Sequence, residues 1–230
     1  MGRLIHAAGV MQIPLARFYL AMKIVRRRLH ALNHGQATLT DQARLPSSAI
    51  EWLEKWRRQA LGTRIVEKAC NDKRSFLFTD ASLKGWGAIL VTSDQQIHVT
   101  GGSWRFATAS GDICKLEAAS VSNAIDAFAA TIMASQDGEL EIVVDNTSVQ
   151  HALRRGVARS LDVNENIRPA LEKLQQSRLK VSTRYIHSKD NPADPTSRGL
   201  AFDRKKTCET VTNLRHGGGE AIPIAVSTPS

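Results

Sequence analysis

The sequence predicts an α/β domain, a mixed β-sheet crossed by helices, preceded by a helical segment. From residue 73 onward, short apolar runs and amphipathic stretches follow one another in the order β-β-β-α-β-α-α-β. That order is typical of a mixed sheet with helices packed across it. Before residue 70 only helical periodicity occurs. The chain has 230 residues, of which 42% are hydrophobic, so it can bury a core and whole-chain disorder is excluded.

Basic residues are concentrated near the N-terminus. The net charge is +9, and residues 1–40 contain six Lys and Arg but no acid, whereas the remaining 25 bases face 22 acids. A basic arm on a nearly balanced body indicates a polyanionic partner, nucleic acid before membrane. No run approaches the about 20 apolar residues that a bilayer-spanning helix needs, so an integral membrane protein is excluded. The three widely spaced cysteines predict neither a disulfide framework nor a metal knuckle.

Residues 1–70 are predicted to form a helical segment. Apolar residues recur there at three- and four-residue steps, and Gly35 marks a stop: Leu15, Phe18, Met22, Val25 and Leu29. This helix could pack on the domain and present Arg26–Arg28 to phosphates. It could also be an organellar transit peptide or carry a solvated basic face. A second helix over 47–62 places Trp52 and Trp56 one turn apart, as core or interface anchors.

Residues 71–200 are predicted to form the α/β domain. Its five strands are short apolar runs, at 75–80, 86–92, 96–104, 140–146 and 180–187. Short turns join the first three strands, which predicts an antiparallel meander. Helices are predicted over 113–132, 147–156 and 160–177; Pro169 means that the last is kinked or begins late. Residues 201–230 contain a glycine run and a Ser/Pro-rich end, which predicts a flexible tail.

Four acids stand at the ends of predicted elements. Asp80 and Asp145 end two strands, and ligands in open α/β sheets bind at such carboxyl ends. Glu117 shares a core-facing helical stripe with Val121, which costs several kcal/mol unless a counter-charge or metal meets the carboxylate. Asp194 lies in the Pro-rich loop after the last strand. Clustered carboxylates on a basic protein suit divalent ions, which screen the acids from an anionic substrate.

Each acid also has a structural interpretation. Asp80 and Asp145 could each begin a turn. Beside Asp145, Asn146 also supplies helix-capping chemistry. Asp194, followed by a proline, could cap a helix, and Glu117 could favour the helix dipole. Both interpretations of each acid remain open from the sequence alone.

Five motifs resemble the ribonuclease H domain of retroelement polyproteins. In chain order they are FTDASLKGWGAIL, GGSW, KLEAASVSNAIDAF, LEIVVDNTSVQHALRRG and YIHSKDNPADPTSRG, which together span Phe76 to Arg198. The GWGA and NPADPTSRG segments look most like DIRS-type (tyrosine-recombinase) retrotransposons, with a trypanosomatid VIPER-like element as the nearest source. Residues 2–27 and 49–61 resemble the thumb/connection region of such elements. The resemblance implies a ribonuclease H-like three-layer fold with a five-stranded mixed sheet.

The resemblance also implies the activity, which is divalent-metal-dependent cleavage of the RNA strand of an RNA/DNA hybrid. It assigns the binding of two Mg²⁺ ions to Asp80, Glu117, Asp145 and Asp194. Carboxylate sites also accept Mn²⁺, which is the alternative metal. His187 stands near the position of the family's mobile catalytic histidine, or is structural at the end of a strand. Expected contacts to the nucleic-acid backbone are Lys84, Trp86, Arg154 and Arg155, although surface charge also explains the three bases.

The chain departs from a complete reverse transcriptase because it has no Asp-Asp pair and hence no polymerase motif. We therefore expect an upstream reverse transcriptase domain in an intact polyprotein, or a detached relative. The expected location is the nucleus or cytoplasm, in a retroelement particle, or the mitochondrion if the basic N-terminus is a transit peptide. A catalytically silent ribonuclease H-like module that only binds nucleic acid or has a structural role is the alternative function.

Overall fold

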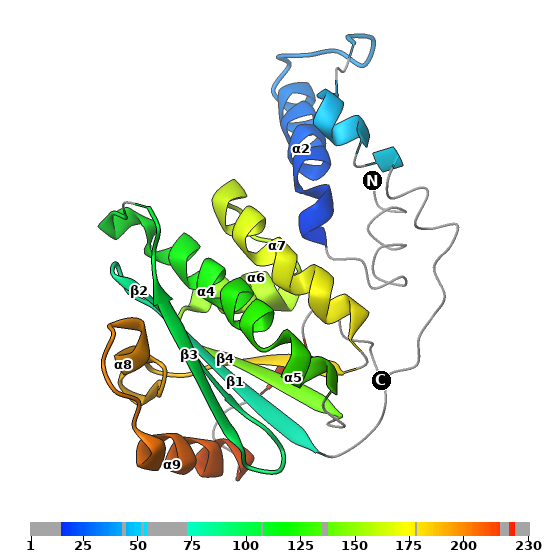
Figure 1. Cartoon of the computed structure of the whole chain (residues 1–230). Coiled ribbons are helices and arrows are strands. Elements are labelled where there is room, and N and C mark those ends of the chain that lie inside the picture. Colours follow the sequence, from blue (N-terminus) through cyan, green and yellow to red (C-terminus); the bar gives the residue numbers. More distant parts are fainter. Residues whose placement is uncertain are drawn as a thin grey trace.

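The protein is described by a computed structural model (Figure 1) that covers residues 15–42, 45–51, 53–54, 73–106, 108–134, 138–177, 179–216 and 221–223, without the side chain at position 17. Trp52 and Trp56 of the predicted second helix lie outside these residues, as do two stretches of the predicted tail, 217–220 and 224–230. Within the described ranges, no helix is both long and apolar enough to span a bilayer.

The sheet has the strand order β3-β2-β1-β4-β5-β6. Strands β1 (Arg74–Ala81), β2 (Gly85–Val91) and β3 (Ile97–Ser103) form the predicted antiparallel meander. Strands β4 (Glu139–Val144) and β5 (Lys180–Tyr185) run parallel to β1. A short strand β6 (Ile222–Pro223) pairs antiparallel with the outer edge of β5. The predicted ribonuclease H-like α/β fold is therefore confirmed, and β6 is a two-residue addition to its five strands.

Helices cover both faces of the sheet, which gives three layers (Figure 1). On one face lie α4 (Ile113–Ala127), α5 (Ala129–Ala134), α6 (Thr147–Arg155) and α7 (Leu161–Gln176). On the other lie α8 (Asp194–Ser197) and α9 (Arg204–Arg215). Strand β1 contributes Leu77 to the first core and Phe76 and Phe78 to the second. Because β1 is buried on both faces, it is a continuous apolar run rather than an alternating one.

The predicted long helix over 113–132 is two helices. Phe128 leaves the helical conformation (φ −99°, ψ 10°) and separates α4 from α5, yet the five residues of the predicted stripe are all buried: Glu117, Val121, Ile125, Phe128 and Ile132. Pro169 lies inside α7, which begins at Leu161, so a late helix start is wrong.

The flexible tail predicted for residues 201–230 is wrong over its first half. Helix α9 buries Thr207, Val211 and Leu214, and the two apolar residues join the second core. Its N-cap Asp203 accepts a hydrogen bond from the backbone N–H of Lys206 at 3.0 Å. The sequence did not predict this helix because it has only three buried residues and basic residues flank them.

A buried ion network connects the sheet to α9. Glu141 is fully buried on β4 and binds Arg184 of β5 and Arg74 of β1, the latter at 3.1 Å. Arg184 Nη1 also donates to the backbone carbonyl of Leu214 at 3.4 Å. These charges are paired across three strands, as buried charges must be.

The N-terminal helix packs against the domain. A 3₁₀ turn (Leu15–Phe18) leads into α2 (Tyr19–Asn33), and Gly35 follows it with φ +65°, as expected for a stop. Phe18 and Met22 of the predicted stripe are buried, whereas Leu29 is 53% exposed. Only the first half of α2 therefore packs on the body.

Candidate metal centre

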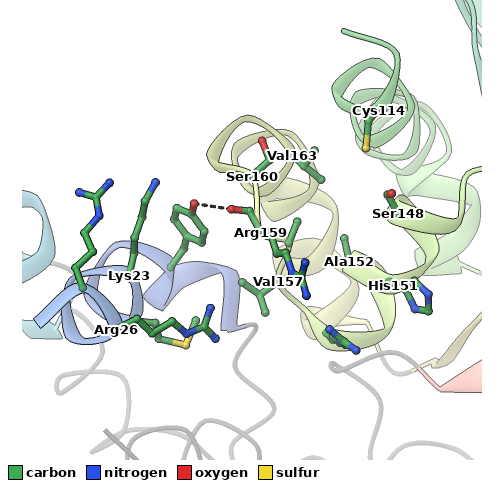
Figure 2. A pocket seen from close by; sticks show the side chains of 15 residues that line it. Lys23, Arg26, Cys114, Ser148, His151, Ala152, Val157, Arg159, Ser160 and Val163 are labelled. Carbon is green, nitrogen blue, oxygen red and sulfur yellow. Dashed lines mark hydrogen bonds between the residues drawn. The ribbon is translucent and has the colours of Figure 1, made fainter. Parts of the chain in front are cut away.

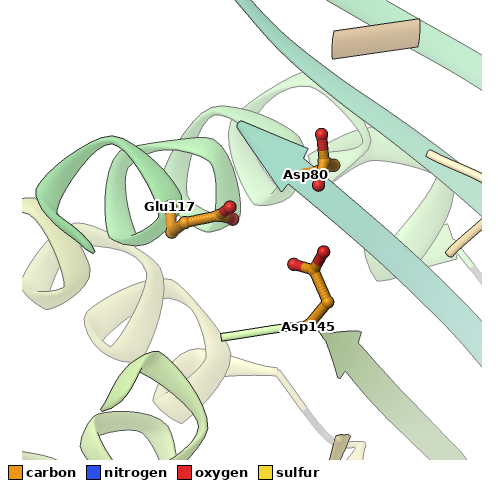
Figure 3. A group of neighbouring side chains, drawn as sticks. All are labelled: Asp80, Glu117 and Asp145. Carbon is orange, nitrogen blue, oxygen red and sulfur yellow. The ribbon is translucent and has the colours of Figure 1, made fainter. Parts of the chain in front are cut away.

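Three predicted carboxylates meet at one edge of the sheet. Strands β1 and β4 are parallel neighbours, so their carboxyl ends lie together. Asp80 is the penultimate residue of β1, and Asp145 directly follows β4. Figure 3 shows both side chains pointing toward Glu117, which reaches them from the first half of α4. One ligand oxygen from each of the three lies within 4.8 Å of the others.

The fold holds Glu117 in place through α4, whose stripe residues Val121 and Ile125 are buried in the first core. The backbone N–H of Ala81, next to Asp80, hydrogen-bonds to the Glu117 carboxylate. The other oxygen, Glu117 Oε2, is buried without a hydrogen-bond partner among the described residues, and so is Asp145 Oδ1. Two such buried acceptors in one acidic cluster suit a positively charged ligand.

The electrostatics of the cluster lead to the same conclusion. Burial raises the pKa of Asp80 to about 7, with added repulsion from Asp145 and Asp194 and an opposing hydrogen bond from Ser197. Burial, followed by the charges of Asp80 and Asp145, raises the pKa of Glu117 to about 9. Ionised together, these carboxylates repel one another unless a cation enters.

The donor set fits a divalent metal. All three ligands are carboxylate oxygens, which Mg²⁺ prefers, and the group can supply several oxygens to one ion or to a pair. Carboxylates equally accept Mn²⁺. The buried oxygens without partners mark where an ion would be held, at the interface between α4 and the sheet.

Asp194 lies beside this group rather than within it. Asp194 is the first residue of α8, and the N-cap of that helix is Ala193. The interpretation of Asp194 as a helix cap is therefore wrong. Asp194 Oδ1 accepts hydrogen bonds from Arg198 Nη2 at 2.8 Å and Nε at 3.1 Å. Its charge still raises the pKa of Asp80, so the two carboxylates are electrostatic neighbours.

Gly87 and Asn191, which the sequence did not predict as functional residues, hold α8 in place. Gly87 lies opposite Asp80 in the β1–β2 ladder, and a Cβ there would be 2.5 Å from the backbone nitrogen of Ser197. Asn191 is fully buried; its Nδ2 donates to the Thr79 carbonyl at 3.0 Å, and its Oδ1 accepts from Ala193 N–H at 3.1 Å. The motifs GWGA and NPAD contain both residues, but their packing role depends on the tertiary contact.

Of the other predicted site residues, His187, Lys84 and Trp86 lie next to the ends of β5, β1 and β2. His187 is exposed just after β5, and its ring packs edge-on against Tyr185 with centroids 5.5 Å apart. Lys84 is exposed in the β1–β2 turn, close in sequence to Asp80. Trp86 is half-buried against the first core, so its ring is partly structural. Arg154 and Arg155 are exposed in the last turn of α6.

No protein-family model matches the chain, and no curated protein does. Solved ribonuclease H structures are similar in structure. Ribonuclease H1 from the halophilic archaeon Halobacterium salinarum NRC-1 is 19% identical, with a TM-score of 0.42 over 53% of this chain and 91% of that one. A ribonuclease H1 in complex with an RNA/DNA hybrid is 12% identical, with a TM-score of 0.45 over 56% and 96%.

A foamy viral protease-reverse transcriptase in complex with double-stranded DNA is also similar. It is 13% identical, with a TM-score of 0.33 over 70% of this chain and 33% of that one. Because all these identities are low, the function of this chain is inferred from its own site.

Proposed function

We propose that this chain is a divalent-metal-dependent endoribonuclease that cleaves the RNA strand of RNA/DNA hybrids. One observation carries the proposal: Asp80, Glu117 and Asp145 converge at the carboxyl edge of β1 and β4, and two of their buried oxygens have no hydrogen-bond partner among the described residues. Such a cluster is costly to build, and a metal-dependent phosphodiesterase has a use for it.

In this function the three carboxylates bind the metal and fix its position between α4 and the sheet. When bound, divalent ions lower the pKa of an attacking water and neutralise charge on the leaving oxygen. Asp194, the fourth proposed ligand, is oriented by Arg198, which can release it when a ligand enters. We assign to His187 a role in proton transfer or product release, which its exposed ring permits.

The proposed substrate is read by shape and by the 2′-hydroxyl rather than by base edges. Lys84, Arg154 and Arg155 are proposed to contact backbone phosphates, and the exposed side of Trp86 to border the same surface.

The proposed source is a retrotransposon reverse transcriptase, most like the DIRS type. The five sequence motifs support this origin, and an upstream reverse transcriptase domain would be the covalent partner in the intact polyprotein. The proposed location is a nuclear or cytoplasmic retroelement particle; a mitochondrial location is the alternative if residues 1–40 act as a transit peptide.

Cleavage of a labelled RNA/DNA hybrid by Asp80→Asn tests the function. The substitution removes a metal-binding charge at nearly constant volume, so we expect cleavage to be lost while the far-UV circular dichroism spectrum is unchanged. Asp162→Asn is the matched control, because it neutralises an exposed carboxylate on α7. If the native chain fails to cleave with either Mg²⁺ or Mn²⁺ and binds hybrid equally without metal, the chain is a silent nucleic-acid-binding module instead.

A further inference from the structure

A cavity of about 830 Å³ lies between α2 and the corner that joins α6 to α7. Figure 2 shows Lys23 and Arg26 of α2 on one side of it and Arg159 and His151 on the other. One wall therefore comes from the N-terminal segment and the other from the ribonuclease H-like domain. The cavity is separate from the three-carboxylate cluster, none of whose members lines it.

The lining is strongly basic. Among the described residues that line it, five are Lys or Arg and none is Asp or Glu: Lys23, Arg26, Arg27, Arg155 and Arg159. Arg28 is not part of it, because its guanidinium donates to the backbone carbonyls of Thr38 and Asp41. Like charges on facing walls repel one another, so an anion between the walls would stabilise the arrangement.

Hydrogen bonds and apolar packing hold the two walls together. The backbone N–H of Ala16 donates to the Gly156 carbonyl at 2.6 Å, and the Tyr19 hydroxyl donates to the Arg159 carbonyl at 2.7 Å. Ala16 joins the first core, and Phe18 is 1% exposed. The cavity is therefore formed by packed segments rather than by two loosely apposed surfaces.

One end of the cavity reaches the elements that carry the acidic cluster. Its lining includes Cys114, one turn before Glu117 on α4, and Ser148, three residues after Asp145. A polymer bound near the carboxylates could therefore continue across the α6–α7 corner to α2.

We propose that this cavity binds the sugar-phosphate backbone of the nucleic-acid substrate, so that α2 is part of the substrate-binding surface. The inference deepens the proposed function and rests on it for the identity of the substrate. Guanidinium groups pair with phosphates through paired N–H donors, and a row of them follows a backbone rather than reading bases. The sequence left three interpretations of the basic helix open, and the two-walled cavity favours phosphate binding.

Charge reversal on α2 tests the proposal. The variant Arg26→Glu/Arg27→Glu changes two exposed cavity residues, and the control Arg204→Glu/Lys205→Glu makes the same charge change on exposed α9 positions. Fluorescence anisotropy of a labelled hybrid, in chelator to prevent cleavage, gives the affinity at several salt concentrations. We expect the cavity variant to bind at least about tenfold more weakly with a shallower salt dependence, and the control to change less than about threefold.

The opposite wall provides an independent variant. Arg159→Glu leaves its backbone carbonyl available to Tyr19, and it should also weaken binding, with circular dichroism and thermal melting unchanged. The proposal would be overturned if the α2 variant and its control lost equal affinity for the hybrid, or if the variants of neither wall lost affinity. Displacement of the hybrid by polyglutamate at equal charge concentration would also overturn it, in favour of an acidic protein partner.

The two proposals can fail separately. If the hybrid is never cleaved but its binding depends on both walls, the nuclease function fails and the basic cavity stands. If the hybrid is cleaved and its affinity is indifferent to both walls, the cavity proposal alone fails.

Discussion

Asp80→Asn should weaken the fall in stability that the metal-free protein shows as pH rises. Between about pH 4 and about pH 7, the folded protein keeps a proton on Asp80 that the unfolded chain has lost, since burial raises the pKa from 3.8 to about 7. The unfolded state then binds fewer protons, so the free energy of unfolding falls as pH rises. Glu117, whose pKa is raised to about 9, extends the same trend to higher pH.

The size of the effect follows from the shift. Each group contributes a slope of up to about 1.4 kcal/mol per pH unit, so Asp80 alone can cost up to about 4 kcal/mol by pH 7. The asparagine variant does not bear this cost, so its stability relative to the native chain should rise across the interval. Partly exposed carboxylates such as Asp112, whose pKa is lowered by a hydrogen bond from Lys115, affect stability only below about pH 4, where stability rises with pH.

Urea unfolding followed by far-UV circular dichroism, at a series of pH values in chelator, measures this difference. Adding Mg²⁺ should stabilise the native chain most at high pH, by about 3 kcal/mol at a concentration one hundred times its dissociation constant. The Asp80→Asn variant should gain less, and the Asp162→Asn control should follow the native chain. Parallel pH profiles for the native and Asp80→Asn proteins would refute the reasoning, because the three carboxylates would then not be desolvated together.

Three further changes probe the scaffold around the site. Gly87→Ala should reduce hybrid cleavage by about a hundredfold while hybrid binding persists, because a Cβ 2.5 Å from Ser197 N displaces α8; unchanged cleavage kinetics would contradict this placement. Glu141→Gln should lower the free energy of unfolding in urea by about 3–5 kcal/mol, because it leaves the Arg184 charge buried with weaker partners; a loss below about 1 kcal/mol would show that water solvates the network. Val211→Ala should cost about 2 kcal/mol in the same assay, since Val211 packs in the second core, and a neutral result would mean that α9 is not docked.

The parts of the fold set by local periodicity could be predicted from the sequence. Short apolar runs predicted the five strands, and the helical phase of Val121 and Ile125 placed Glu117 toward the sheet. The convergence of Asp80 and Asp145 then required only that their strands be parallel neighbours, which they are.

Contacts between distant segments could not be read in the same way. Asp194 pairs with Arg198, and the motif alone does not predict this partner. The packing of α8 against Gly87 depends on a close approach between the backbones of β2 and α8, which are distant in sequence. Helix α9 was missed because Val211 and Leu214 are its only buried aliphatic residues, too few to produce a clear period.

The docking of α2 also determines how small a working fragment can be. A truncated protein that begins at β1 would keep all the carboxylates yet lose Ala16 from the core and the hydroxyl of Tyr19 from the α6–α7 corner. Such a fragment would expose the apolar surface that Ala16 covers and would retain only one wall of the basic cavity. Transferring the α/β domain into another polypeptide therefore requires carrying α2 with it.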